Sequence, residues 1–461
     1  MNNQTTKLLR LDDMILNRRG SFVRRFIHAI VSLSLRLFFR RIETYNESSV
    51  PYKGALIFVA NHPNGLVDPS LVFVALPRKI SFLAKSTLFR IPGFSYLLKV
   101  VEALPVYRRI DSADVSKNQR TFEACHDLLQ EGGAIAIFPE GVSHNSPKLL
   151  PLKTGAARIA LGALSGMVGD ADFDLHIVPV GLYYTNKTTF RSDALLNFGE
   201  PFRVSKPSLD VDGNPERQEV TNLSDRIEKS LREVTVNAES KGDIDEARAG
   251  ANLFLSVSET LNIEGTIVER FEFVRNYLEL EDGEGREDES VTAQVSEFKK
   301  KLRQLGLEPE NLSLSSEPVG FVLRTFVLRL LVLMMMLPIS LIGSLIHFPA
   351  YQVSKLLADR YTHHGVDDII SSVKIISGIV LMPITWVLAA FGVYYWTGSA
   401  YSLFVIPVSF LFGYVALRSW EEYAELRGWL RASWVFYTKR KLFLELLSER
   451  RKLAESLKPV K

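Results

Sequence analysis

A histidine and an aspartate follow a short apolar stretch early in the chain. The segment "ALIFVANHPNGLVDPS", Ala55 to Ser70, places five residues between His62 and Asp68. Histidine is the side chain best suited to accept a proton near neutral pH. A carboxylate that binds its second ring nitrogen fixes the tautomer and stabilises the imidazolium. Because no partner serine or cysteine lies beside His62 in the sequence, we expect His62 to activate a hydroxyl of the substrate. The alternative is that the His62–Asp68 contact is a purely structural hydrogen bond.

The region around this pair alternates short apolar runs with helical patterns, which predicts an α/β domain with a mostly parallel sheet flanked by helices. The predicted strands are residues 54–60, 79–85, 133–139 and 175–184, and the predicted helices are residues 115–131 and 154–164. In such sheets ligands bind at the carboxyl ends of strands, where His62 stands. Pro63 fits a first helical turn, because its missing N–H is not needed there.

Three further blocks follow the first in a fixed order. They are "VEALPVYRR" (Val101–Arg109), "AIAIFPEGVSH" (Ala134–His144) and "HIVPVG" (His176–Gly181). Together with the histidine and aspartate block, they resemble the His-x-Asp, arginine, Phe-Pro-Glu-Gly and Val-Pro motifs of the glycerol-phosphate and lysophospholipid acyltransferase superfamily. The resemblance covers about Ala55 to Pro201.

The resemblance implies a role for each motif residue. His62 would deprotonate the acceptor hydroxyl, which attacks the thioester of an acyl donor, and Asp68 would orient His62. An arginine can bind phosphate through two parallel hydrogen bonds. The residues implied in holding a phosphate-bearing acceptor are Arg108, Glu140 and Gly141, with Lys85 as a further candidate and Lys153 and Arg158 as weaker ones. Glu140 would organise its loop or contact acceptor hydroxyls, and Pro179 would shape the acyl-donor side.

One departure from the superfamily pattern lies inside the first block. The usual spacing has four residues between the histidine and the aspartate, whereas five intervene here, and Gly65 could absorb the extra residue. With "FPEGVSH" and the following "PLKTGAARIAL" (Pro151–Leu161), this longer spacing is similar to the fungal-type branch that acylates glycerol 3-phosphate and dihydroxyacetone phosphate.

Composition excludes several other classes. The 461 residues carry a net charge of only +3, which does not favour nucleic acid as a partner. The single cysteine, Cys125, rules out an intrachain disulfide. The histidine pair in "THHG" (Thr362–Gly365) has no acidic or cysteine partner at ligand spacing, so we expect neither a metal nor a cofactor, only an acyl-CoA or acyl carrier protein donor.

Two long stretches near the carboxyl end lack charged side chains. They are Leu330–Ser354 and Ile375–Leu417. A helix that crosses a membrane once needs roughly 20 apolar residues, and both stretches are longer than that. The second is long enough for a two-span hairpin turning near Trp396–Ser399. A basic tail follows, and positively charged residues stay on the cytoplasmic side. If the α/β domain is also cytoplasmic, the chain must cross the membrane an even number of times. Leu330–Ser354 is then expected to be re-entrant or in-plane. Its prolines, Pro338 and Pro349, suit a bent segment.

The basic and apolar stretch from Arg24 to Arg41 predicts a helix lying in the membrane interface, with an ordinary amphipathic helix packed on the domain as the alternative. The predicted organisation is therefore an interfacial helix (1–44), an acyltransferase domain (45–205), a polar helical region (206–315), a membrane region (316–417) and a basic cytoplasmic tail helix (418–461).

The function implied is that of a membrane-bound O-acyltransferase with its catalytic domain on the cytoplasmic face. It would acylate glycerol 3-phosphate or dihydroxyacetone phosphate in the first step of phosphatidic acid synthesis. Two alternatives remain open. One is acylation of a lysophospholipid such as 1-acylglycerol 3-phosphate, and the other is an inactive membrane scaffold or lipid-binding module. The expected partners are the acyl donor, the glycerol phosphate acceptor and membrane lipids, without nucleic acid.

Overall fold

The computed structural model describes the chain in two compact units. The described residues are 6–8, 21–76, 78–166, 173–211, 213–257, 265–281, 289–309, 311–312, 319–362 and 367–457. The first unit comprises residues 1–237 together with 364–372, and the second comprises 238–363 and 373–461.

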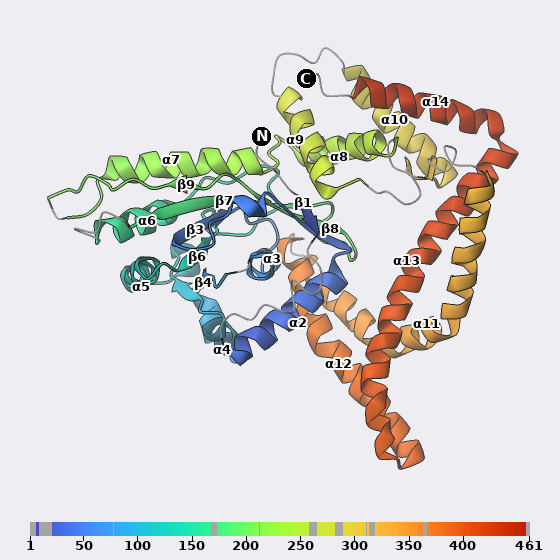
Figure 1. The fold of residues 1–461 in the computed structure, drawn as a ribbon, viewed down its shortest axis with the longest axis horizontal. Helices are drawn as coiled ribbons and strands as arrows, with labels where there is room; N and C mark the ends of the chain where they lie inside the picture. The colour runs from blue at the N-terminus through green and yellow to red at the C-terminus, as the bar shows by residue number, and fades with distance from the viewer. Residues whose placement is uncertain are drawn as a thin grey trace. The chain divides into compact units, whose positions relative to one another are not determined.

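The first unit is built on one mixed sheet (Figure 1). Its strands are β1 (Thr6–Leu8), β2 (Arg41–Tyr45), β3 (Ala55–Ala60), β4 (Ser81–Lys85), β5 (Leu104–Val106), β6 (Ala134–Ile137), β7 (Leu175–Tyr184), β8 (Asp193–Phe198) and β9 (Phe202–Arg203). The order along the sheet is β1-β2-β8-β7-β3-β6-β4-β5, with β9 paired to β7. The pairs β1–β2, β7–β8 and β7–β9 are antiparallel, and the remaining described pairs are parallel. The predicted α/β fold with a mostly parallel sheet is confirmed.

Helices cover both faces of this sheet. They are α2 (Phe22–Phe38), α3 (Val67–Ala75), α4 (Phe94–Val100), α5 (Asn118–Gln130), α6 (Gly155–Ser165) and α7 (Arg217–Val234). Successive strand side chains point to opposite faces. Ile57 and Val59 of β3 therefore join the apolar core under α5, α6 and α7, while Leu56 and Phe58 are buried on the other face. A strand buried on both faces explains why "ALIFVA" is apolar throughout.

The predicted strands and helices all occur, with small shifts at their ends. The predicted strand 175–184 matches β7 residue for residue, and the predicted helix 154–164 corresponds to α6. The expectation for Pro63 is wrong, because α3 begins only at Val67 and Pro69 occupies its first turn instead. The unit also extends past the predicted domain boundary at residue 205, because α7 packs on the sheet.

The N-terminal helix α2 packs on the domain through its more polar face. Arg24 and His28 are buried there, and the Arg24 guanidinium donates to the carbonyls of Ile80, at 3.0 Å, and Val100, at 3.4 Å. The aromatic side chain of Phe22 is left exposed on the other face. These contacts match the packed alternative, and placement of the exposed face in a membrane interface stays a prediction.

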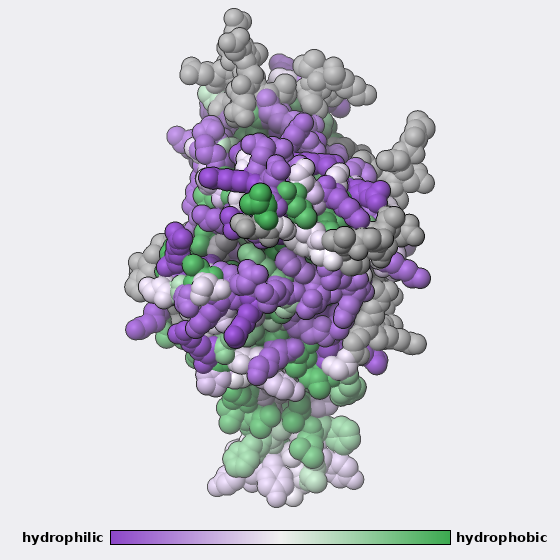
Figure 2. Space-filling view, turned by 90° about the vertical axis from the view of Figure 1, so that its left-hand side faces the viewer, coloured by the Kyte–Doolittle hydropathy of each residue, from purple (hydrophilic) through white to green (hydrophobic). Residues whose placement is uncertain are grey.

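The second unit is helical. It contains α8 (Lys241–Leu255), α9 (Ile267–Glu281), α10 (Glu289–Leu305), α11 (Val319–Thr362), α12 (Ile370–Thr397, whose first three residues belong to the first unit), α13 (Val405–Thr438) and α14 (Arg440–Ser456). Three described segments, within α11, in α12 and from Ala400 to the end of α13, are long and apolar enough to cross a membrane. Figure 2 shows apolar surface on the α12–α13 hairpin. Its turn follows Thr397, as predicted, and Tyr395, Trp396 and Tyr401 are exposed around it, as aromatic residues are at membrane interfaces.

Helices α11 and α13 lie side by side and antiparallel (Figure 1). Arg329 pairs with Glu425 at 2.5 Å, and a Cβ at Gly343 would stand 2.1 Å from the carbonyl oxygen of Phe412. Such close backbone contact through glycine is typical of membrane helix pairs. Both Pro338 and Pro349 lie inside α11, which is continuous and meets the length needed to cross. The expectation that Leu330–Ser354 is re-entrant or in-plane stays a prediction.

Replacing Gly181 with alanine is expected to destabilise the first unit. Gly181 lies in β7, and a Cβ there would stand 1.7 Å from the backbone oxygen of Val234 in α7. Overpacking of this kind costs about 1–3 kcal/mol of unfolding free energy. Burial raises the pKa of Cys125 to about 12, so its thiol is unreactive until the unit opens. The rate of Cys125 labelling by a maleimide measures that opening, and we expect it to rise in Gly181→Ala.

The matched control is Gly155→Ala, because a Cβ at Gly155 meets no atom within 4 Å. Labelling of that variant should stay at the wild-type rate. Equal labelling of the two variants would contradict the proposed packing of β7 against α7.

Candidate active site

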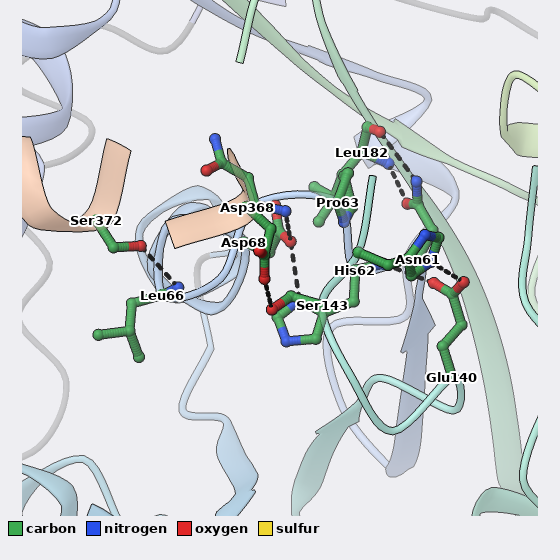
Figure 3. Close-up of polar contacts among 12 residues, drawn as sticks. Asn61, His62, Pro63, Leu66, Asp68, Glu140, Ser143, Leu182, Asp368 and Ser372 are labelled. Carbon is green, nitrogen blue, oxygen red and sulfur yellow. Dashed lines mark hydrogen bonds and ion pairs between the residues drawn. The ribbon is translucent and has the colours of Figure 1, made fainter. Parts of the chain in front are cut away.

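The predicted histidine and aspartate meet at the carboxyl end of β3. His62 lies two residues beyond the end of β3, and Asp68 lies in the first turn of α3. Their atoms Nδ1 and Oδ2 are 2.8 Å apart, and Figure 3 shows the two side chains facing each other. Asp68 is fully buried, whereas the His62 side chain is 18% exposed. A carboxylate accepts from Nδ1–H, so Nε2 of His62 carries the free lone pair and can act as a base.

Asp68 receives two further hydrogen bonds. The backbone N–H of Asn64 donates to Oδ2 at 2.7 Å, and the hydroxyl of Tyr184, at the end of β7, donates to Oδ1 at 2.5 Å. Burial first, and then the Asp68 charge, raise the pKa of Tyr184 well above its usual value. The phenol therefore stays protonated and remains a donor to Asp68.

The backbone on either side of His62 is also fixed. The Asn61 side chain pairs with Leu182 of β7, donating to its carbonyl at 3.1 Å and accepting from its N–H at 2.7 Å. The imidazole of His62 stacks on Phe138, with ring centroids 4.3 Å apart. These contacts hold the histidine between β7 and the segment that follows β6.

Glu140 of the Phe-Pro-Glu-Gly block is buried beneath this histidine. Its Oε1 accepts the backbone N–H of His62 at 2.8 Å (Figure 3), and its Oε2 accepts the N–H of Leu150 at 2.9 Å. Its Oε2 also pairs with His144 Nε2. Ser146 N–H donates to His144 Nδ1 at 3.0 Å, so the His144 proton is on Nε2 and points at Glu140. Both carboxylate oxygens are thus engaged in organising the loop.

Arg108, which lies two residues after the end of β5, contacts the same turn. Its Nη1 donates to the carbonyl of Gly141 at 2.5 Å, while Nε and Nη2 bind the two carboxylate oxygens of Asp111 at 2.7 and 3.1 Å. Lys85, at the end of β4, lies 3.0 Å from the same carboxylate. Hydrogen bonding to Arg108, and then to Lys85, lowers the pKa of Asp111. The two predicted phosphate ligands, Arg108 and Lys85, therefore form one cluster around Asp111.

The remaining predicted residues lie less directly at the site. The backbone N–H of Lys153 donates to Pro139 at 2.8 Å, and its exposed side chain runs past Gly141. Arg158 is exposed on α6, and no contact joins its side chain to His62 or Arg108 in the described part of the chain. Pro179 is buried in β7 opposite Val59, so it can act on the acyl-donor side only through packing.

Three residues of the site, Tyr184, His144 and Asp111, are not predicted from the sequence. Tyr184 ends a predicted strand, and a tyrosine at the carboxyl end of a central strand was a usable signal. His144 lies inside the quoted "FPEGVSH" block, and Asp111 lies three residues after Arg108, but the sequence analysis assigns neither of them a role.

Within the described residues no group of three metal-ligating side chains occurs, and His363 and His364 of "THHG" lie outside those residues.

Two family models match the chain. The model described as Acyltransferase matches residues 41–183, which contain the four motif blocks and the His62–Asp68 pair. The model described as Glycerol-3-phosphate acyltransferase 2 C-terminal domain matches residues 247–460. The second match covers α11 to α14, including the three apolar segments.

Curated relatives include glycerol-3-phosphate O-acyltransferases 2 and 1 of Saccharomyces cerevisiae. The first is 28% identical over 63% of this chain and 40% of its own length, and the second is 22% identical over 82% of this chain and 62% of its own length. The chain thus spans less than two thirds of either relative. A 1-acyl-sn-glycerol-3-phosphate acyltransferase of Bacillus subtilis is 31% identical over 28% of this chain and 60% of its own length.

Among solved structures, a 1-acyl-sn-glycerophosphate acyltransferase from Thermotoga maritima matches 47% of this chain and 83% of its own, with 19% identity and a TM-score of 0.33. The family assignment stands on the two domain matches and the curated relatives. The chain belongs to the glycerol-phosphate and lysophospholipid acyltransferase superfamily, and it pairs the acyltransferase domain with the C-terminal domain of the fungal-type glycerol-3-phosphate acyltransferases.

Proposed function

We propose that this protein is a membrane-bound O-acyltransferase that moves a fatty acyl group from a thioester to glycerol 3-phosphate or dihydroxyacetone phosphate. The observation that carries the proposal is the turn at Glu140 and Gly141. Glu140 binds the backbone of the histidine, and Gly141 binds the arginine. A general base and an anion-binding cation are therefore held by adjacent residues, as acylation of a phosphate-bearing alcohol requires.

In the proposed reaction, Nε2 of His62 takes the proton of the acceptor hydroxyl. The hydroxyl oxygen attacks the carbonyl carbon of the acyl thioester. The resulting tetrahedral adduct collapses as its C–S bond breaks, and the proton held on His62 passes to the leaving sulfur. Asp68 accepts from Nδ1–H throughout and stabilises the imidazolium between these two steps.

The phosphate of the acceptor is proposed to bind at Arg108 and Lys85. A guanidinium has five N–H donors, of which three serve Asp111 and Gly141, so two have no partner in the described part of the chain. The Lys85 side chain is 40% exposed and can add a second positive charge. Lys153 and Arg158 remain weaker candidates, whose exposed side chains suit an incoming anion rather than a fixed contact.

The membrane region suits the chemistry of the product. The acceptor is soluble and anionic, whereas the acylated product is amphiphilic, so a protein anchored by apolar helices can release it into the adjoining leaflet. We place the catalytic domain on the cytoplasmic face because basic residues, such as Arg427 and Lys441, follow the last apolar stretch. The acyl donor is a substrate, either acyl-CoA or acyl carrier protein, and the proposed reaction uses no metal or other cofactor.

Acylation of 1-acylglycerol 3-phosphate is the second candidate. It is favoured by the Bacillus subtilis relative, which carries that name and matches 28% of this chain. The match to the glycerol-3-phosphate acyltransferase C-terminal domain, over residues 247–460, favours the first-step acceptors instead. An inactive scaffold is the third reading, and the intact His62–Asp68 contact argues against it.

Substituting His62 with alanine is expected to abolish most of the acyl transfer. We would offer the purified full chain glycerol 3-phosphate, dihydroxyacetone phosphate and lysophosphatidate separately, with a long-chain acyl-CoA and then an acyl carrier protein donor. Product is expected from one of the first two acceptors. Loss of the general base should lower turnover by roughly 10²–10⁴ in His62→Ala.

His176→Ala is the matched control, since His176 lies at the opposite end of β7 and pairs with Asp174. Cys125 labelling verifies that both variants are folded. Product from lysophosphatidate alone would replace the proposed acceptor and keep the mechanism. Full activity in His62→Ala would overturn the mechanism, and no turnover with any pair would favour the scaffold.

Substituting Tyr184 with phenylalanine is expected to lower kcat roughly tenfold, because a buried carboxylate loses one charge-assisted hydrogen bond. The KM values of acceptor and donor should stay within about twofold, since Tyr184 acts through Asp68 and His62 rather than on a substrate. Steady-state kinetics of Tyr184→Phe separate the two quantities. Tyr183→Phe is the matched control one residue earlier in β7. A wild-type kcat in Tyr184→Phe would show that Asp68 does not depend on this donor.

Substituting Asp111 with asparagine is expected to lower the KM of the phosphate-bearing acceptor roughly threefold. The change frees donors of Arg108 and removes a negative charge beside the proposed anion site. Asp114→Asn is the matched control, because Asp114 binds Ser116 instead. A higher acceptor KM in Asp111→Asn would mean that Asp111 holds the two cations in place for the phosphate.

A further inference from the structure

A short segment from far along the chain packs against the catalytic loop. It comprises Asp367 to Ser372, the residues that enter and form the first turn of α12, and it belongs to the same compact unit as His62. Asp368, Ser371 and Ser372 are all buried. Their partners lie in three different loops around the proposed active site.

The first of these loops is the one between His62 and Asp68. The backbone N–H of Leu66 donates to Ser372 Oγ at 3.0 Å (Figure 3). Gly65 has a positive φ of 43°, and a Cβ there would stand 2.9 Å from the backbone oxygen of Asp368 and 3.1 Å from Ser372 Oγ. A side chain at position 65 would therefore collide with the segment. The loop with one residue more than the usual spacing is also the loop that the segment contacts.

The second loop follows Glu140 and Gly141. The hydroxyl of Ser143 donates to the Asp368 carboxylate, and Figure 3 shows this contact beside the imidazole of His62. His144 N–H donates to the carbonyl of His62 at 3.2 Å. One carboxylate of the segment is thus tied to the loop that also holds the histidine backbone.

The third loop follows β7. The hydroxyl of Ser371 donates to the carbonyl of Lys187. The Lys187 ammonium in turn donates to the carbonyls of Pro63, at 2.7 Å, and His144, at 3.3 Å. Asn64 Nδ2 donates to the same Lys187 carbonyl at 3.3 Å. The three loops are therefore joined to one another as well as to the segment.

We propose that the segment Asp367–Ser372 positions the catalytic loop, with Ser372 and Asp368 as positioning residues for His62 and Asp68. This inference rests on the proposed acyl transfer. The segment touches the backbone of the loop rather than the imidazole, so it sets where His62 stands rather than taking part in proton transfer. Because the same residues begin α12, the catalytic loop is held by the start of a helix that is apolar enough to cross a membrane.

The test compares two serine substitutions in the full-length protein. Ser372→Ala removes the acceptor of the Leu66 N–H. Ser377→Ala, less than two turns further along α12, removes a buried hydroxyl that binds Ser354 and does not touch the catalytic loop. We would measure kcat and both KM values, together with hydrogen exchange of the Leu66 amide. For Ser372→Ala we expect kcat to fall roughly fivefold, both KM values to stay within about twofold, and Leu66 to exchange faster.

A second variant, Gly65→Ala, forces the loop away from the segment. We expect its kcat to fall by on the order of 10²-fold, because small misplacements of catalytic groups have effects of that size. The rate of Cys125 labelling shows whether the variant is folded. Ser377→Ala should match wild type in kcat and in Leu66 exchange.

Two results would overturn the proposal. Leu66 exchange that does not change in Ser372→Ala would show that the segment does not hold the loop. Faster Leu66 exchange with a wild-type kcat would show that the contact does not position His62. If the wild-type protein acylates none of the three acceptors, the proposed function fails, and Leu66 exchange still decides whether the segment holds the loop.

Discussion

The buried carboxylate of Asp68 is the constraint on which the site depends. A carboxylate removed from water is strongly unfavourable unless hydrogen-bond donors replace the water. Here the donors come from the imidazole of His62, the backbone of Asn64 and the hydroxyl of Tyr184. His62 and Asn64 lie in the loop after β3, Tyr184 ends β7, and Asp68 itself lies in the first turn of α3. These three parts of the fold must therefore be in place together. The position of the base is thereby fixed before any substrate binds.

A second buried carboxylate extends this arrangement to the proposed acceptor site. Glu140 binds the backbone of His62, and the next residue, Gly141, accepts from Arg108. The distance from base to cation is then set by a single turn rather than by two independently moving loops. Such preorganisation is what a bimolecular acyl transfer needs, since holding the reacting groups in place removes much of the entropic part of the barrier.

The parts that could be predicted from sequence are those whose signal is local. Strands buried on both faces read as apolar runs, and β3 and β7 were found in this way. His62 was found because it lies two residues beyond a strand end, Asp68 because of its spacing to His62, and Glu140 because of the Phe-Pro-Glu-Gly block that contains it. Tyr184 was missed because its partner Asp68 is 116 residues away. The strands β2 and β8 were missed because their sequences, "RIETY" and "DALLNF", mix polar and apolar residues.

The contact between Asp367–Ser372 and the catalytic loop could not have been predicted, since no pattern in either stretch indicates the other. Its physical basis is nevertheless simple. Leu66 N–H and the hydroxyl of Ser143 need partners when buried, and a short polar segment between two apolar helices supplies them. In the proposed acyl transfer, water at those groups would stand near His62 and compete with the acceptor for the thioester. Polar residues at the start of an apolar helix therefore satisfy the buried polar groups of the catalytic loop and replace the water that these groups would otherwise need.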